Sequence, residues 1–137
     1  YWAVLEDAAG GGTDVTYSVT IQEHNLSATH AVLSMGDTAA TFDTGDLDVH
    51  PLDVLAGATY HIRLIAADSD FLDPVLYLVD PSSGALLAAN DDEDAGGGNY
   101  NSFITYQPAD DTTLWVVAGY ARADFSAGTI EYTVRVE

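Results

Sequence analysis

The sequence predicts an all-β protein, a sandwich or barrel formed by one domain. Short runs rich in Val, Ile, Thr and Tyr recur between Gly, Asp, Asn and Pro residues, a pattern typical of these folds. Several runs alternate apolar and polar residues, which indicates strands with one buried and one solvent-facing side. Helix-favouring patterns are weak throughout. With 137 residues, 47% of them hydrophobic, the chain is long enough for one buried core.

The clearest of the expected strands comes last. There Ile130, Tyr132, Val134 and Val136 fall on one side and polar residues on the other, so the apolar side is expected in the core. The expected strands, in order along the chain, cover residues 15–22, 59–65, 75–80, 85–89, 102–107, 113–120 and 129–136.

Positions within these runs also predict the surroundings of single side chains. His61 alternates with Ile62 and Leu64 and is expected on the outer surface. Core packing is expected for three aromatic residues inside apolar runs, Tyr77, Trp115 and Tyr132. Three others near predicted loops are candidates for a binding surface: Tyr100, Tyr120 and Phe125.

Between the strands, two segments call for separate interpretation. The sequence Asp80-Pro81-Ser82-Ser83-Gly84 predicts a hairpin turn, because Pro81 fixes its own φ and Gly84 tolerates a left-handed backbone. Residues 28–35 are left as strand or turn. They could form one or two helical turns, but Gly36 and Asp37 would break any continuation.

The chain begins with an apolar, strand-like segment, Tyr1, Trp2, Ala3, Val4 and Leu5, which the flexible residues 8–12 separate from the rest. We therefore divide the chain into residues 1–12 and a sandwich domain of residues 13–137. The segment is either the first strand of its own sheet or the tail of a preceding domain. Alternatively, it is a donor strand that adds to the sheet of a neighbouring copy and, when repeated, forms a filament.

The charge of the chain excludes several functions. Its 22 acidic residues face three Arg and no Lys, for a net charge of −19, so binding to nucleic acid or to an anionic membrane is not expected. No apolar run reaches the roughly 18 residues that cross a bilayer. Without cysteine, a small secreted domain needs another means of stabilisation, such as calcium. Adaptation to high salt is a rival explanation of the acidity.

One loop concentrates groups that suit a hard cation. Residues 90–101 carry four carboxylates and three side-chain amides around a glycine-rich centre. Calcium accepts oxygen ligands from carboxylates, amides and backbone carbonyls, and would relieve the repulsion between these charges. The spacing is not that of an EF-hand. A solvated acidic loop is the alternative.

The order of the motifs resembles the bacterial pre-peptidase C-terminal domain. The likeness spans roughly residues 32 to 136. It is carried by Gly45-Asp46-Leu47-Asp48, residues 55–60 and 72–77, Gly84, Asn90-Asp91-Asp92, Asn101-Ser102 and residues 128–134.

The resemblance implies a fold, a cofactor and a ligand set. The fold would be a jelly-roll-like antiparallel β-sandwich, and the cofactor would be calcium. Ligands carried over from the family are Asp73, Asn90, Asp91 and Asp92, completed by Asn101 or Asp94, with Asp46 and Asp48 as second choices. The sequence departs from the family at Val49-His50-Pro51, where an aromatic residue is usual, and residues 1–27 lie outside the likeness.

An enzyme is not expected. The histidines at 24, 30, 50 and 61 lie on separate segments, and neither H-E-x-x-H nor G-x-S-x-G occurs. The sequence favours a secreted structural subunit that forms a homo-oligomer or filament at the cell surface. The alternative is an accessory domain of an exported hydrolase, with a polysaccharide or protein ligand.

Overall fold

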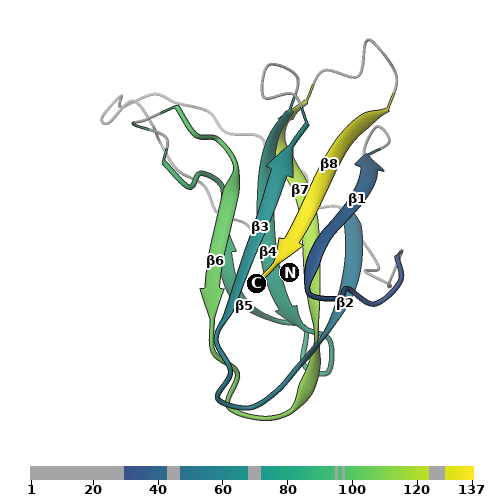
Figure 1. The fold of residues 1–137 in the computed structure, drawn as a ribbon, viewed down its shortest axis with the longest axis vertical. Coiled ribbons are helices and arrows are strands. Elements are labelled where there is room, and N and C mark those ends of the chain that lie inside the picture. The colour runs from purple at the N-terminus through teal and green to yellow at the C-terminus, as the bar shows by residue number, and fades with distance from the viewer. Residues whose placement is uncertain (1–29, 43–46, 68–71, 95, 97, 124–128) are drawn as a thin grey trace, which may run out of the picture.

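The computed structural model describes residues 30–42, 47–67, 72–94, 96, 98–123 and 129–137, and these form an all-β sandwich (Figure 1). Every pairing between its strands is antiparallel. The eight strands are β1 (Gly36–Phe42), β2 (Asp48–Val54), β3 (Tyr60–Ala66), β4 (Leu72–Asp80), β5 (Ala85–Asn90), β6 (Ser102–Tyr106), β7 (Thr112–Ala123) and β8 (Ile130–Val136).

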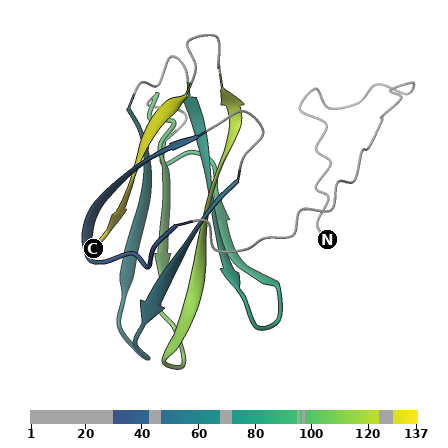
Figure 2. The same ribbon diagram turned by 90° about the vertical axis from the view of Figure 1, so that its right-hand side faces the viewer.

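The strands form two four-stranded sheets that pack face to face (Figure 2). Sheet A has the order β1-β8-β3-β6, and sheet B has the order β2-β7-β4-β5. Eight strands divided between two sheets in this order make a jelly roll, so the predicted fold class is confirmed. The part of the chain that is described contains no helix long and apolar enough to cross a membrane.

The core lies between the sheets and is built from alternate residues of each strand. The predicted inner side of β8 is confirmed, since Ile130, Tyr132, Val134 and Val136 are all buried. Most expected strands are confirmed with small shifts at their ends. The one predicted for residues 15–22 lies outside the described residues.

Two strands, β1 and β2, were not expected from the sequence. Small and polar residues dominate β1, and Pro51 lies in the middle of β2, so neither reads as a strand. Pro51 is tolerated because β2 is an edge strand of sheet B and its partner β7 lies on one side only. Residues 30–33 run along the free side, where His30 N–H donates to Val49 O (3.1 Å) and Leu33 N–H donates to Pro51 O (2.7 Å).

The hairpin between β4 and β5 forms as predicted. Gly84 adopts φ +71°, and its N–H donates to Asp80 O at 2.8 Å. The Asp80 carboxylate accepts hydrogen bonds from the N–H of Ser82 and from the hydroxyls of Ser82 and Ser83. These bonds hold the pKa of Asp80 below its usual value.

Three predictions for single side chains can be compared with the structure. Tyr132 is buried in the core, and His61 lies on the outer face of sheet A, both as expected. Tyr77 and Trp115 instead lie on the outer face of sheet B, where they pack against a second apolar cluster of Val49, Val79 and Val117. Their strands, β4 and β7, carry apolar residues on both sides, so an apolar neighbourhood in the sequence does not show that a side chain faces the core between the sheets.

Candidate metal site and buried polar cluster

The predicted calcium ligands gather at one end of the sandwich, where β4 begins and the connection between β5 and β6 crosses over. Ser102 joins these two segments, because its Oγ lies 2.7 Å from Pro74 O and 3.1 Å from Asp91 O. Asp73, next to Pro74, is thereby brought towards the group of residues 90–92. Whether these two acidic segments share a metal ion stays a prediction.

The two predicted amide ligands already hold strands in place. Asn90 Oδ1 accepts from Phe103 N–H (2.8 Å), and Asn90 Nδ2 donates to Asp92 O (3.1 Å). Asn101 Oδ1 accepts from Ala66 N–H at 3.0 Å. A carbonyl oxygen has two lone pairs, so either amide oxygen could bind an ion in addition to its present bond.

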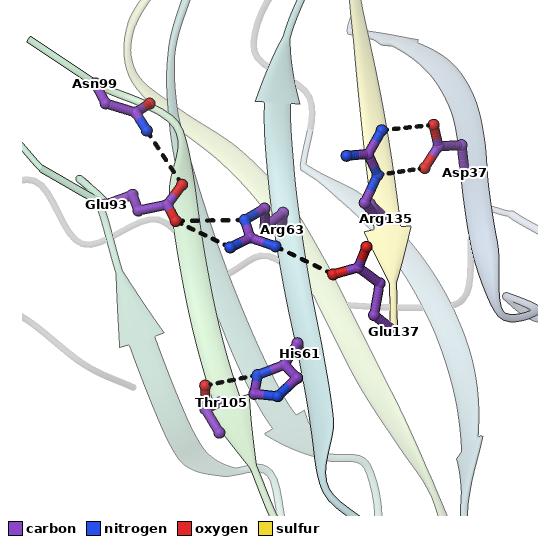
Figure 3. Close-up of polar contacts among 8 residues, drawn as sticks. All are labelled: Asp37, His61, Arg63, Glu93, Asn99, Thr105, Arg135 and Glu137. Atoms are coloured by element: carbon purple, nitrogen blue, oxygen red, sulfur yellow. Dashed lines mark hydrogen bonds and ion pairs between the residues drawn. The ribbon is translucent and has the colours of Figure 1, made fainter.

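The acidic loop is closed by its own hydrogen bonds. Glu93 N–H donates to Asn101 O (2.6 Å), and Asp94 and Asn99 exchange two backbone bonds. The Glu93 carboxylate contacts Arg63 at 3.1 Å and accepts from Asn99 Nδ2 at 3.1 Å (Figure 3). An arginine therefore takes up one of the carboxylates that were expected to need a metal ion.

Asp92 carries the feature that best fits a cation. Its Oδ1 is shielded from solvent and has no hydrogen-bond partner among the residues described. A buried carboxylate oxygen without a partner is costly, and a calcium ion would satisfy it. Asp91 and Asp94 are exposed. The pKa of Tyr77 is raised mainly by the burial of its own ring and secondly by the negative charge of Asp91.

The carboxylates do not form a closed cage by themselves. Within the described ranges, no group of three His, Asp or Glu side chains converges on one point. An ion at this end would therefore combine Asp92 with backbone and amide oxygens, which calcium accepts and which magnesium uses less readily.

A second polar cluster, which the sequence did not predict, lies in the core between the sheets. His50 is 0% exposed, and its Nε2 lies 2.9 Å from the hydroxyl of Tyr132 on β8. Tyr132 donates its proton to Asp48 Oδ2 at 2.6 Å. The His30 ring stacks on the His50 ring with centroids 4.2 Å apart, and His30 Nε2 lies 3.2 Å from Asp48 Oδ1.

These contacts assign the tautomer of His50. Tyr132 gives its only proton to Asp48, so its oxygen accepts from His50 Nε2–H, and Nδ1 of His50 carries the lone pair. That Nδ1 is buried without a hydrogen-bond partner among the described residues. Burial, followed by the nearby His30, lowers the pKa of His50 to about 4, against an opposing effect of Asp48. Burial and the Asp48 carboxylate raise the pKa of Tyr132.

The cluster ties layers together rather than holding a metal. The His30 and His50 rings are nearly parallel, at 12°, and a ring nitrogen binds a metal ion in the plane of its ring. Two stacked planes do not meet at one ion. Asp48, a second-choice calcium ligand, is committed to this cluster instead. Asp48 and His50 occupy every second position of β2 together with Leu52 and Val54. This shared side is the sequence signal that could have placed the two polar residues inside the sandwich.

Other predicted residues are placed as follows. Tyr1, Trp2, Ala3, Val4, Leu5, Asp46 and Phe125 lie outside the described residues. Tyr100 is 42% exposed, as a binding aromatic would be. Tyr120 packs against the core and contacts the edge of Phe42, which does not fit the predicted binding role.

Comparison with known proteins finds likeness in structure alone. No protein-family model and no curated protein matches the sequence. The pre-peptidase C-terminal domain of a collagenase from Bacillus anthracis is similar, with a TM-score of 0.59 and 12% identity, over 83% of this chain and 100% of that chain. CorA, a surface-associated copper-binding protein of Methylomicrobium album BG8, is similar with a TM-score of 0.56 and 11% identity, over 79% and 99%.

At such identities the likeness concerns the fold. It agrees with the strand order, which is that of a jelly roll. The chain therefore has the fold of a pre-peptidase C-terminal domain, as the order of its sequence motifs predicts.

Proposed function

We propose that this chain is a non-catalytic, extracellular β-sandwich module that calcium stabilises at the end formed by Asp73 and residues 90–92. The observation that carries the proposal is Oδ1 of Asp92, which is shielded from solvent and has no hydrogen-bond partner among the described residues. It lies next to two segments that Ser102 holds together. The fold supports it, because the similar structures include a module of a collagenase and a surface-associated protein. The copper of the second protein is not carried over.

The surroundings of the described histidines support a non-catalytic role. His50 bonds Tyr132 in the core, and His30 stacks on it. His61 bonds the Thr105 hydroxyl at 3.0 Å and stacks on Phe103. All three therefore serve the packing of the sandwich, which suits a binding or structural module.

Calcium binding is tested by the melting temperature of the purified chain in millimolar calcium and in excess chelator, at matched ionic strength. We expect calcium to raise the melting temperature of the native chain, and Asp92→Asn to abolish most of that rise. The control is Asp110→Asn, which removes an exposed carboxylate from the β6–β7 loop at the other end. An equal calcium response of both variants would refute the site.

Assembly into filaments is a second candidate, which the free strand edges favour. Among the strands described, β5 pairs only with β4 and β6 only with β3, so each leaves one edge for an added strand. The predicted donor is Tyr1 to Leu5. We expect calcium to increase particle size in light scattering, and Ala3→Pro to prevent it by removing a backbone donor, whereas Ala9→Pro in the tether should not. Monomers both with and without calcium would contradict filament assembly and would leave the accessory module as the remaining candidate.

A further inference from the structure

Two neighbouring rows of residues on the outer face of sheet B are apolar across all four of its strands. Register places Pro51 of β2 opposite Trp115 of β7, Trp115 opposite Val79 of β4, and Val79 opposite Leu86 of β5. These four side chains form one continuous row. None of them carries a charge or a hydrogen-bonding group other than the indole N–H.

A second row runs beside the first and has the same character. It joins Val49, Val117, Tyr77 and Ala89 by register. Val49 and Val117 are only 1% and 2% exposed, although they point away from the core between the sheets. We refer to the two rows together as the apolar face.

Such a face is unusual for an antiparallel sandwich. The outer side of an antiparallel sheet is normally polar because water covers it. The two rows hold no acidic residue, and the acidic groups next to them lie at the ends of the face, with Asp53 beside the first row and Asp91 near Tyr77. Trp115, Tyr77 and Leu86 pack against the buried valines but remain only partly covered. An apolar surface on the outer side of a sheet is a candidate docking site.

The course of the chain indicates what lies on this face. The described part begins at His30, whose N–H bonds Val49 O, and continues to Leu33, whose N–H bonds Pro51 O. Val49 and Pro51 are the ends of the two rows, so His30 lies at the border of the apolar face. The 29 residues that precede His30 in the sequence are therefore attached to the chain at this border. Four strands span roughly 15 Å, which about five extended residues can cross.

Residues 15–22 have a composition that complements the apolar face. They carry no charge and alternate strictly, so one side of a strand would present only apolar groups. That side consists of Val15, Tyr17, Val19 and Ile21. We propose that residues 15–22 dock in extended form on the apolar face of their own chain, with this side against Trp115 and Tyr77. The docking is independent of calcium.

The indole of Trp115 reports on this docking. In a Trp2→Phe background Trp115 is the only tryptophan, since the chain has two. We expect Val19→Asp to shift its emission to longer wavelength and to increase quenching by acrylamide at least twofold. Thr20→Asp adds the same charge on the opposite side of the segment and should change neither. Unchanged emission and quenching in Val19→Asp would overturn the proposal.

A spin label distinguishes this occupant from a second copy. The chain has no cysteine, so Thr20→Cys provides one labelling site that points away from the face. We expect the label to broaden the amide signals of Val79, Leu86 and Trp115 and to spare Arg63 on the outer face of sheet A. Broadening that appears only when labelled and isotope-enriched chains are mixed would assign the face to another copy. No broadening at all would also contradict docking.

Discussion

The outer faces of the two sheets differ in polarity. On sheet A, register aligns Asp37, Arg135, Arg63 and Phe103 in one row across the four strands. Arg135 binds the Asp37 carboxylate through two nitrogens, at 2.6 and 2.9 Å (Figure 3). Arg63 lies 4.3 Å above the Phe103 ring. The equivalent rows of sheet B are apolar. The outer face of sheet A therefore carries charged pairs, whereas these rows on the outer face of sheet B carry no charge.

The largest expected effect comes from placing the same charge on each face. Val117→Lys buries an ammonium among apolar neighbours and should lower the free energy of unfolding by about 4 kcal/mol. Thr133→Lys, on the outer face of sheet A, should change it by less than about 0.5 kcal/mol. Denaturant unfolding measures both. Equal losses would show that the two faces do not differ in the way described.

Acid should loosen the link between the two sheets. The folded-state pKa of His50, about 4, is below the ordinary 6.5, so the unfolded chain binds its proton first as pH falls. Stability should therefore decline between pH 6.5 and pH 4, by about 3 kcal/mol in total. The groups that face His50 are His30, Asp48 and Tyr132.

The contribution of His50 is isolated by substitution. His50→Gln keeps a donor for Tyr132 but does not titrate, so its free energy of unfolding should fall less steeply with acid than that of the native chain. His61→Gln, on the outer face of sheet A, is the matched control and should keep the native slope. Identical slopes in all three proteins would contradict the role of His50.

A smaller effect is expected at Gly119 on the outer side of sheet B. A Cβ there would lie 2.9 Å from Leu47 Cδ2, closer than carbon atoms approach. The leucine end is flexible, so Gly119→Ala should cost about 1 kcal/mol in thermal unfolding. A stabilised variant would indicate that Leu47 does not pack over this strand.

The smallest effect is expected on the outer face of sheet A. Arg135 lowers the pKa of Asp37 through its hydrogen bonds, but both groups are exposed and solvent screens them. Asp37→Asn should leave the melting temperature within the error of the measurement at physiological salt. A clear loss would mean that this pair, and not packing, holds β1 to β8.

The sequence predicted what depends on local pattern. The alternation in β8 identified its buried side, and the Asp80 to Gly84 turn identified the hairpin, since both rest on neighbouring residues. The strand β2 was missed because its pairing with β7 and residues 30–33 outweighs Pro51. No local signal shows which side of an apolar strand faces outward, so Trp115 was assigned to the core.

The candidate sites also divide into features that the local sequence indicates and features that depend on contacts between distant residues. The acidic segments at Asp73 and residues 90–92 were recognised by composition and motif order, and Ser102 does join them. Arg63 was not expected to bind Glu93, because the two residues are 30 apart in sequence. His50 and Tyr132 are 82 residues apart, and only the packing of sheet B on sheet A makes them partners.

The position of β8 has a consequence for how the chain folds. It lies between β1 and β3 and is the only strand that joins them in sheet A, with Gly36 opposite Val136. Strand β1 can therefore pair only after residues about a hundred positions later in the sequence have been synthesised. Such distant pairing slows folding, because loop closure precedes any favourable contact. Until β8 has been synthesised, β1 has no partner among the described strands, so we expect sheet A to be completed only after the end of the domain has been translated.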